Sequence, residues 1–322
     1  MKPVLAVLDT AYGDVDVERR VAVDRGVEVL DARDGAADAR EADGVLVQFA
    51  DIGAAEMDAH PRWRVIGRYG VGVDTIDIAA ATSRGIRVVN VPDYCEEEVA
   101  THAAALALAS VRRVPQADRL VRAGRWTHWR DLTPMPALSQ ATLGVIGLGR
   151  IGRETIRLLR PFFGDVVAYD PYVDTSDDVT LAPLETVLAR ADVLTLHLPL
   201  TSETRHVIDA AALRRMKPTA HVVNVSRGAL IDTAALAAAL EAGALAGAAV
   251  DVLETEPADP ADPLLTAPGA IVTNHIAWYS EQSEPRLRAL LSERCASLLV
   301  GGDAPSIVNR AALAATAGRN TP

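Results

Sequence analysis

The sequence predicts an α/β protein with two domains, each built on a doubly wound parallel sheet. Three observations predict this fold class. The chain has 322 residues, whereas a single hydrophobic core stops growing at roughly 250 to 300 residues. Short β-branched runs alternate with helical stretches from residue 3 to residue 90, and a second series of the same kind begins at TLGVI. Strands that alternate with helices form parallel sheets covered on both faces.

The first series contains the apolar runs PVLAVLD, VEVLD, GVLVQFA, RVIGRYG and IRVVNV. Helical stretches such as 15–25 and 75–84 separate these runs. This alternation predicts a flavodoxin-like unit.

A long helical region rich in alanine and leucine follows at residues 96–123. We expect Pro115 to interrupt this region and Gly124 to end it. The second series then runs through VVAYD, VLTLHLPL, HVVNVS, AGAAVDV and AIVTNHI. A last helix, which begins near residue 280, has no place in that series, so we expect it to return to the first unit.

The chain is acidic, with a formal net charge of −11 and a pI of about 5.1. Nucleic acids and anionic membranes are disfavoured as partners, because long-range repulsion opposes the encounter. Lys2 and Lys217 are the only lysines, so arginine must supply the positive charge that a small anionic substrate needs. The same scarcity excludes a Walker A loop and a Schiff-base mechanism in the interior.

Cys95 and Cys295 are the only cysteines, and their spacing contains no metal-ligand pattern. We expect no metal site and no disulfide framework, as is usual in a reducing compartment. The apolar run in MKPVLAVLD is too short for a signal peptide, and no segment approaches the ~20 apolar residues of a membrane helix. The expected location is the cytoplasm.

A glycine pattern, GLGRIG, follows the apolar run TLGVI and opens a helix. In this context Gly147 permits a tight turn, Gly149 lets the backbone approach a pyrophosphate, and Gly152 lets helix and strand pack closely. The amino terminus of the helix offers unpaired N–H groups to the anion, and Arg150 is a candidate for a direct charge contact. The alternative interpretation is a purely structural turn.

A dinucleotide fold also needs an acceptor for the adenosine ribose, about 20 residues after the glycines at the end of the second strand. Asp170 ends the run VVAYD at about that separation. A carboxylate there binds the ribose diol and repels the additional phosphate of NADP. The second series therefore predicts a Rossmann domain that binds NAD.

Three polar residues follow successive predicted strands of this second domain: Arg227 after HVVNVS, Glu256 in VDVLETEP and His275 after AIVTN. Open parallel sheets bind ligands at the carboxyl ends of their strands, so the three side chains are expected to converge. Ketone reduction requires a hydride and a proton, and histidine suits proton transfer at neutral pH.

His275 is therefore the expected proton donor, and a carboxylate at Glu256 would orient the ring. Arg227 is expected to bind the carboxylate and keto oxygens of a 2-keto acid, because a planar guanidinium matches two adjacent acceptors. Taken singly, each of these residues is also compatible with a solvated loop charge or an ion pair.

The motifs RYGVGVDTID, NVPDYCEEEVATHA, the glycine pattern, HLPLTSETRHVI, NVSRGALID, VDVLETEP and HIAWYS occur in this order over nearly the whole chain. With them the sequence resembles the D-isomer-specific 2-hydroxyacid dehydrogenase family. DYCEEEVA and HIAWYSEQS most resemble its C-terminal-binding-protein-like branch, which includes transcriptional corepressors. One departure is Asn274, where the family usually has proline.

The resemblance implies a discontinuous substrate-binding domain, residues 1–98 and 281–322, and an NAD-binding domain, residues 99–280, with an active-site cleft between them. Arg227, Glu256 and His275 match the catalytic arginine, glutamate and histidine of the family. The implied activity interconverts a 2-keto acid and its D-2-hydroxy acid with NAD.

Further site residues are implied by the same resemblance. Those along the cofactor are His102, Ile151, Leu198, Pro199, Thr204, Val225, Ser226 and Asp251, the last near the nicotinamide carboxamide. Those at the substrate are Arg68, the loop Val71, Gly72 and Val73, whose backbone N–H groups hold the substrate carboxylate, and Trp278, an aromatic wall of the pocket. The alternatives are a structural role for His102 and a packing role for Trp278.

Two functions of different classes fit this sequence. The first is an NAD-dependent 2-hydroxyacid dehydrogenase; the second is an NAD-sensing, corepressor-like binding protein with little or no turnover. The intact set of arginine, glutamate and histidine favours the enzyme. Relatives commonly dimerise through the nucleotide domain and its long helix, so the resemblance also implies a homodimer.

Overall fold

The computed structural model describes residues 1–33, 38–126 and 128–319. The chain divides into two compact units, unit 1 with Met1–Cys95 and Tyr279–Pro322, and unit 2 with Glu96–Trp278. The sequence motifs placed the divisions after residues 98 and 280. Each unit has its own parallel sheet, so the predicted fold class of two α/β domains is confirmed.

Unit 1 contains a five-stranded sheet in the order β2-β1-β3-β4-β5. Its strands are β1 (Val4–Val7), β2 (Glu28–Asp31), β3 (Gly44–Val47), β4 (Val65–Arg68) and β5 (Arg87–Val89). All paired neighbours are parallel. This strand order is the flavodoxin-like one.

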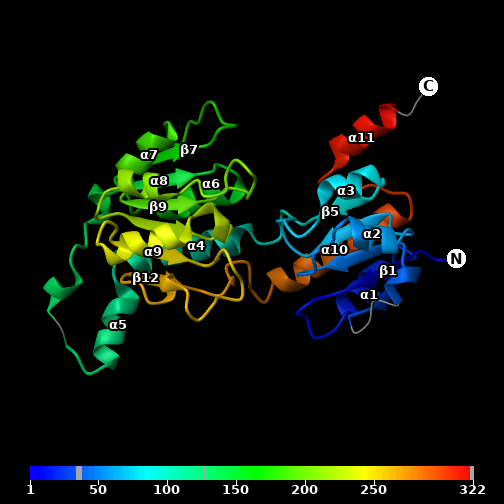
Figure 1. Cartoon of the computed structure of the whole chain (residues 1–322), viewed down its shortest axis with the longest axis horizontal. Coiled ribbons are helices and arrows are strands. Elements are labelled where there is room, and N and C mark those ends of the chain that lie inside the picture. The colour runs from blue at the N-terminus through cyan, green and yellow to red at the C-terminus, as the bar shows by residue number, and fades with distance from the viewer. Residues whose placement is uncertain (34–37, 127, 320–322) are drawn as a thin grey trace. The chain divides into compact units, whose positions relative to one another are not determined.

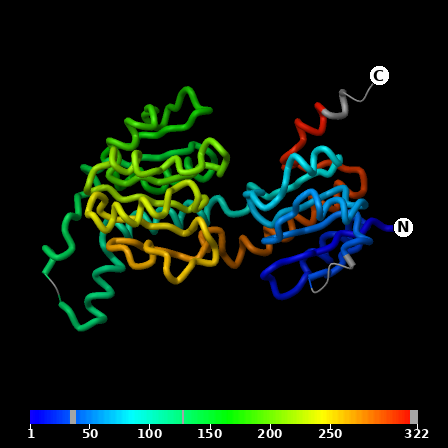
Figure 2. Tube along the Cα trace, in the orientation of Figure 1, coloured from blue at the N-terminus to red at the C-terminus, as the bar shows by residue number. Residues whose placement is uncertain are grey.

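The helices of unit 1 are α1 (Asp16–Val23), α2 (Ala54–Ala59), α3 (Ile78–Ser83), α10 (Ser283–Leu299) and α11 (Arg310–Arg319). α10 packs against α1 and β4, and α2 packs against α3. Figure 2 shows the orange and red C-terminal segment lying beside the blue and cyan strands of this unit. The core between these layers includes Val45, Ile66 and Val88, which are completely buried.

Unit 2 contains a seven-stranded sheet in the order β12-β11-β10-β9-β6-β7-β8. Its strands are β6 (Thr142–Ile146), β7 (Asp165–Tyr169), β8 (Thr180–Leu181), β9 (Val193–Leu196), β10 (His221–Asn224), β11 (Gly247–Val250) and β12 (Ala270–Val272). All paired neighbours are parallel. The order is that of a Rossmann sheet with one additional strand, β12.

The helices of unit 2 are α4 (Glu96–Val111), α5 (Val114–Arg122), α6 (Arg150–Leu159), α7 (Leu184–Arg190), α8 (Ala210–Arg215) and α9 (Thr233–Glu241). α4 packs against α6 and against β10 and β11, while α7, α8 and α9 pack on one another (Figure 1). Every residue of β9, β10 and β11 is buried. Such continuous burial is typical of parallel strands covered on both faces.

The long helical region expected at residues 96–123 breaks earlier than Pro115. α4 ends at Val111, and Arg113 adopts a left-handed conformation with φ of +55° before α5 begins. Pro115 lies in the first turn of α5, where its missing N–H removes no helical hydrogen bond. The break therefore comes from the backbone of Arg113, and Gly124, at φ +75°, follows the end of α5.

Within the described ranges, no helix is long and apolar enough to cross a membrane. Among the same residues, no group of three histidine, cysteine, aspartate or glutamate side chains is arranged to hold a metal ion. In the same ranges, Cys95 and Cys295 are buried and form no disulfide.

Candidate active site

The glycine pattern connects β6 to α6. Gly147 follows β6 with φ of +97°, and Gly149 is the N-cap of α6. A β-carbon on Gly147 would collide with the carbonyl oxygen of His197, and one on Gly152 would collide with the carbonyl oxygen of Gly147. Both positions therefore require glycine, because the turn and the helix pack directly on backbone.

Gly149 lies in a different environment, because a β-carbon there would meet nothing within 4 Å. The first N–H groups of α6 have no partner within the helix, and open space beside such donors is what a pyrophosphate requires. Arg150 is exposed and forms an ion pair with Glu96, with Nη1 and Oε1 3.3 Å apart. Ile151 is half-buried.

Asp170 directly follows β7, and its carboxylate reaches the glycine loop. Oδ2 accepts a hydrogen bond from the backbone N–H of Leu148 at 2.7 Å, and Oδ1 accepts one from Tyr172 at 2.8 Å. The carboxylate therefore lies beside the turn that carries Gly147 and Gly149. This is the position expected of a ribose acceptor.

His275 and Glu256 form a close pair. Nδ1 of His275 lies 2.7 Å from Oε2 of Glu256, and both side chains are partly exposed, at 40% and 37%. The other carboxylate oxygen, Oε1, accepts a hydrogen bond from the backbone N–H of Leu253 at 2.9 Å. His275 adopts φ of +56°, a left-handed conformation that is uncommon for residues other than glycine.

Burial raises the pKa of Glu256, but the hydrogen bond and charge of His275, the Leu253 N–H and the charge of Arg227 outweigh burial and lower this pKa below its ordinary value. Glu256 is therefore ionised at neutral pH and can only accept. It follows that Nδ1 of His275 carries the proton in this pair, which leaves Nε2 for exchange with a substrate.

Arg227 follows β10 and lies close to the loop that carries Glu256. Its Nη1 donates to the carbonyl oxygen of Ser226 at 2.7 Å. A β-carbon on Gly228 would collide with the backbone of Leu253, so the chain after Arg227 packs directly on the segment before Glu256. The structure thus brings Arg227, Glu256 and His275 to neighbouring loops at the carboxyl ends of β10, β11 and β12.

Asp251 directly follows β11 and anchors the loop that contains His275. Its side chain is fully buried. Oδ1 accepts from Oγ1 of Thr273 at 2.5 Å and from the N–H of Ile276 at 3.1 Å, and Oδ2 accepts from the N–H of Ala277 at 2.9 Å. Burial raises the pKa of Asp251, but hydrogen bonds from a histidine of α4, Thr273 and these two N–H groups outweigh it and lower the pKa.

That histidine is His102. Its Nε2 lies 3.2 Å from Oγ1 of Thr273 and 3.5 Å from Oδ1 of Asp251. The structure therefore places His102 beside Asp251, both directly and through Thr273, and the resemblance assigned both residues to the cofactor. The carbonyl oxygen of Asp251 also accepts the backbone N–H of His275 at 2.7 Å.

The remaining cofactor candidates lie in the loops after β9 and β10. Oγ1 of Thr204 donates to the carbonyl oxygen of Pro199 at 2.7 Å, which closes the loop that also contains Leu198. Oγ of Ser226 donates to the carbonyl oxygen of Leu196 at 2.8 Å, and Val225 is buried. These loops share the carboxyl edge of the sheet with the glycine turn.

The substrate candidates Arg68, Val71, Gly72 and Val73 belong to unit 1, and Trp278 is the last residue of unit 2. Arg68 ends β4, and a β-carbon on the nearby Gly70 would collide with its Nη1. The guanidinium therefore lies over the start of the Val71–Val73 loop. The carbonyl oxygen of Val71 accepts from Nδ2 of Asn90 at 2.6 Å. Trp278 is half-buried.

A second histidine–glutamate pair was not predicted from the sequence. Nε2 of His206 lies 2.8 Å from Oε2 of Glu254, and His206 also has a positive φ, +51°. The contacts of Thr273 with both His102 and Asp251 were not predicted either. The close packing at Gly228, directly after Arg227, was not predicted either, although a glycine in that position is a sequence signal for close backbone approach.

A Rossmann-ordered sheet with a glycine turn before α6 and a carboxylate after β7 defines a dinucleotide-binding domain. Proton-transfer groups at the same edge of that sheet are typical of a dehydrogenase. Residues 104–277 match the family described as D-isomer specific 2-hydroxyacid dehydrogenase, NAD binding domain. The chain belongs to this family, and it is an NAD-dependent oxidoreductase that acts on 2-hydroxy acids.

Relatives support the assignment. A glyoxylate reductase of Thermofilum pendens is 38% identical over 284 residues, which cover 85% of this chain and 83% of the relative. The crystal structure of TT0316 protein from Thermus thermophilus matches with a TM-score of 0.84 and 34% identity, covering 95% of this chain and 99% of that one.

A third match is an NADPH-dependent glyoxylate/hydroxypyruvate reductase of Sinorhizobium meliloti, solved in complex with NADP and malonate. Its TM-score is 0.83 with 31% identity, and the match covers 96% of this chain and 97% of that one.

Proposed function

We propose that this protein reduces a small 2-keto acid to its D-2-hydroxy acid, and catalyses the reverse reaction, with His275 as the acid and base. The observation that carries the proposal is the 2.7 Å contact between His275 and Glu256 on loops adjacent to Arg227. The D configuration follows from the family to which the chain belongs.

His275 donates the proton to the keto oxygen from Nε2 during reduction, and takes it back during oxidation. Glu256 holds Nδ1–H, fixes the orientation of the ring and stabilises the imidazolium form, since a nearby carboxylate favours a positive charge. Because the pKa of Glu256 is lowered, the carboxylate keeps its charge through the neutral range.

Arg227 binds the substrate through its guanidinium, which matches the adjacent carboxylate and keto oxygens of a 2-keto acid. Its positive charge also stabilises the negative charge that develops on the keto oxygen. A lysine could not bind the two adjacent oxygens in this way, because its ammonium group is a point charge without the planar fork of donors.

The residues of unit 2 fit NAD. Gly149 leaves open space at the N-terminus of α6 for the pyrophosphate, and Asp170 presents a carboxylate beside the turn for the adenosine ribose. NAD, when bound, supplies the hydride for reduction and accepts it in oxidation. His102, Ile151, Leu198, Pro199, Thr204, Val225, Ser226 and Asp251 are the further residues that we assign to the surroundings of the cofactor.

We further propose a short substrate of the glyoxylate class. The Thermofilum pendens relative is a glyoxylate reductase, and the Sinorhizobium meliloti relative is a glyoxylate/hydroxypyruvate reductase whose structure contains a three-carbon dicarboxylate, malonate. Arg68 and the loop Val71–Val73 are the proposed partners of the substrate carboxylate, and Trp278 is the proposed aromatic wall.

Two parts of the proposal concern assembly and regulation. A homodimer through the nucleotide domain and the helical region 96–123 is proposed from the resemblance to dimeric relatives. The competing proposal is that the chain belongs to the C-terminal-binding-protein-like branch and senses NAD without turnover. The His275–Glu256 pair favours turnover, because a sensor has no use for an oriented proton donor.

A panel of keto acids tests the proposal. Glyoxylate, hydroxypyruvate, phosphohydroxypyruvate, pyruvate and a thioether keto acid are each supplied with NADH and with NADPH, and cofactor oxidation is followed by absorbance. We expect the highest kcat/KM with glyoxylate or hydroxypyruvate and NADH. Absence of turnover with every keto acid, together with a protein partner that binds only with NADH present, would establish the sensor instead. Light scattering of the purified chain tests the dimer.

A further inference from the structure

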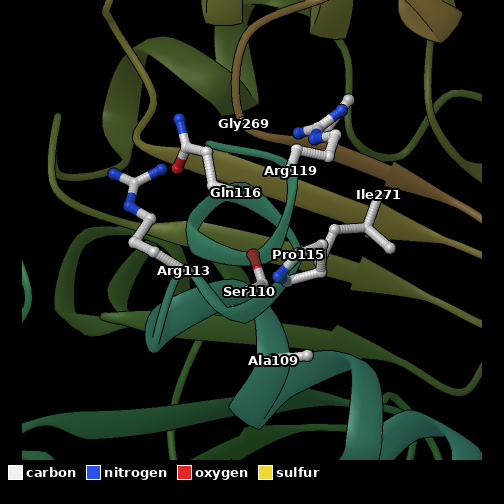
Figure 3. A pocket seen from close by; sticks show the side chains of 9 residues that line it. Ala109, Ser110, Arg113, Pro115, Gln116, Arg119, Gly269 and Ile271 are labelled. Atoms are coloured by element: carbon white, nitrogen blue, oxygen red, sulfur yellow. The ribbon is translucent and has the colours of Figure 1, made fainter. Parts of the chain in front are cut away.

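The loop Val71–Val73, assigned above to the substrate carboxylate, is held in place by contacts within unit 1. The pocket of unit 2 at the α4–α5 break, which Arg113 and Ile271 help to line (Figure 3), belongs instead to the helical region 96–123 that we assign to the dimer. The contacts of the loop include a side chain to which the family comparisons and the proposed activity assign no role.

Three successive N–H groups of this loop are available to a ligand. Among the described residues, the backbone N–H groups of Val71, Gly72 and Val73 have no hydrogen-bond partner. Val71 is exposed, and Gly72 and Val73 are half-buried. Successive N–H groups bind an anion when the backbone holds them in a fixed direction. The groups that fix this direction therefore determine how well the loop binds a carboxylate.

The carbonyl groups of the same peptides are attached to the segment after β5. The carbonyl oxygen of Gly70 accepts from the backbone N–H of Val91 at 2.9 Å, and that of Val71 accepts from Nδ2 of Asn90 at 2.6 Å. A trans peptide is planar, so its C=O and its N–H point in opposite directions. The N–H groups of Val71 and Gly72 therefore point away from Asn90 and Val91.

The contact of Asn90 differs from that of Val91 because a side chain makes it. A donor on a peptide carbonyl oxygen polarises the whole peptide and strengthens its N–H as a donor, since hydrogen bonds in a chain reinforce one another. Nδ2 of Asn90 thus acts on the N–H of Gly72 through the peptide that joins Val71 to Gly72. It fixes the direction of this N–H and raises its partial positive charge.

Asn90 is itself held by the C-terminal part of unit 1. Its carbonyl oxygen accepts from Nη1 of Arg294 at 3.1 Å and from Oγ of Ser306 at 2.5 Å. Arg294 is 7% exposed, and its Nη2 lies 2.7 Å from Oδ2 of Asp93. The backbone of Asn90 therefore has several anchors that do not involve its side chain, and loss of the side-chain amide should leave the backbone in place.

We propose that Asn90 is a positioning residue for the substrate, which holds the Val71–Gly72 peptide so that the N–H of Gly72 is directed at the substrate carboxylate. This inference rests on the proposed function, which assigns the loop to that carboxylate. The carboxylate keeps its charge throughout the reaction, so the contact is present equally in the ground state and the transition state. Asn90 should therefore act on KM far more than on kcat.

Asn90→Ala removes the donor, and Asn309→Ala is the matched control. Nδ2 of Asn309 donates to the carbonyl oxygen of Ile86 at 2.9 Å, so this side chain makes the same kind of contact at the opposite end of β5. Asn309 is 3% exposed, and its Oδ1 also accepts from the N–H of Val88 at 3.0 Å. Its removal should therefore cost at least as much stability as that of Asn90, without a contact to the loop.

Two measurements are made on the wild type and both variants. Steady-state reduction of glyoxylate gives KM and kcat. Binding of malonate to the complex with NADH, followed by NADH fluorescence, reports on carboxylate binding without turnover. Thermal unfolding checks the fold of each variant. Asn90→Asp keeps the size of the side chain but has no N–H donor when ionised, and it serves as a second variant.

We expect Asn90→Ala to raise KM and the Kd of malonate at least about fivefold, as loss of one hydrogen bond implies, and to change kcat less than about threefold. Asn90→Asp should raise both constants at least as much. Asn309→Ala should change them less than about twofold while it lowers the unfolding temperature. The Kd of NADH should stay within about twofold in all variants, since unit 2 binds the cofactor.

Unchanged KM and malonate affinity in Asn90→Ala would overturn the proposal, as would an equal rise in Asn90→Ala and Asn309→Ala, which would indicate a general loosening of unit 1. A loss confined to kcat would also contradict it. If the wild type binds malonate but reduces no keto acid, the proposed function fails, and weaker malonate binding in Asn90→Ala still supports the role of Asn90. If the wild type shows neither turnover nor malonate binding, both proposals fail.

Discussion

Two histidine–glutamate pairs of unit 2 have nearly the same geometry in different surroundings. His275 and Glu256 are 2.7 Å apart, and His206 and Glu254 are 2.8 Å apart. Both histidines have a left-handed backbone, and both glutamates have pKa values below the ordinary value. Geometry within the pair therefore does not distinguish a proton donor from a structural contact.

The surroundings make the distinction. Glu254 also accepts from the backbone N–H of Thr233 at 3.1 Å and faces Arg205 at 3.7 Å, so it connects three loops. The pair around Glu256 lies instead beside Arg227, whose charge reaches the carboxylate. Each pair therefore has an arginine beside it, but only Arg227 follows a strand at the edge of the sheet that carries the glycine turn, so we expect only the pair at Arg227 to take part in catalysis.

The largest effect is expected from His275→Asn compared with His206→Asn. Asparagine tolerates a left-handed φ, so neither substitution should disturb the backbone. Loss of a general acid lowers kcat about 10²- to 10⁴-fold, which we expect for His275→Asn. His206→Asn should change kcat less than about threefold, since it removes only a surface pair.

Steady-state reduction of glyoxylate with NADH measures both variants, and NADH fluorescence checks that cofactor affinity is retained. Comparable losses of kcat in the two variants would show that the pair around His206 takes part in catalysis. The surroundings of a histidine–glutamate pair would then not distinguish a catalytic pair from a structural one.

A smaller effect is expected from Arg227→Lys compared with Arg205→Lys. Lysine keeps the charge but not the fork of donors, so Arg227→Lys should lower kcat/KM about 10²-fold, with part of the loss in KM. Arg205 is largely exposed and 3.7 Å from Glu254, so its substitution should leave kcat/KM within about twofold. Keto-acid saturation curves give both constants, and an unchanged KM in Arg227→Lys would argue against substrate binding by Arg227.

The fold could be predicted from the sequence where its signals are local. Continuous apolar runs predicted the strands β9, β10 and β11, because buried parallel strands need no polar face. The two-residue strand β8 and the break at Arg113 were not predicted. Each depends on packing against distant segments, and the backbone of Arg113 contradicts the usual preference of a non-glycine residue.

The candidate site, too, could be predicted only where its sequence signals are local. The glycine turn was predicted because six consecutive residues carry its geometry, and the structure shows why Gly147 and Gly152 cannot hold a side chain. The pair His206–Glu254 was not predicted, since its members are 48 residues apart and His206 lies in a motif assigned to the cofactor. No local sequence pattern predicts a positive φ at a histidine.

A still smaller effect on kcat is expected from Glu256→Gln, for which Glu254→Gln is the matched variant. The pKa of Glu256 is lowered, so its carboxylate is present at neutral pH and is lost only as pH falls through a value below the ordinary ~4.3. Titration of Glu256 therefore does not shape the rate between pH 6 and 9. Glu256→Gln should lower kcat about 10- to 10²-fold and move the alkaline limb of the reduction profile to lower pH, because the imidazolium loses its counter-charge.

The matched variant, Glu254→Gln, should leave both the rate and the profile unchanged. The pH dependence of kcat, measured from pH 5 to 10 for the wild type and both variants, separates orientation from charge stabilisation. A reduced kcat in Glu256→Gln with an unmoved alkaline limb would restrict Glu256 to orienting the ring.

The smallest effect concerns stability. Asp251 accepts from Thr273, Ile276 and Ala277 and so fixes the His275 loop, whereas Glu254 is partly exposed. Asp251→Asn should reduce the free energy of unfolding by about 1–3 kcal/mol, and Glu254→Gln by less than about 1 kcal/mol. The pKa of Asp251 is lowered in the folded chain, so its contribution is complete above the unfolded value of about 3.9 and is lost as pH falls through the folded value.

The stability difference between wild type and Asp251→Asn should therefore be constant from about pH 6 to 8 and shrink below about pH 4. Urea denaturation at several pH values measures it, with tryptophan fluorescence as the signal. A difference that persists undiminished at low pH would mean that the shape of the Asp251 side chain, rather than its charge, holds the His275 loop. The loop would then keep its geometry in acid, and any loss of activity there would have to arise in the proton-transfer groups themselves.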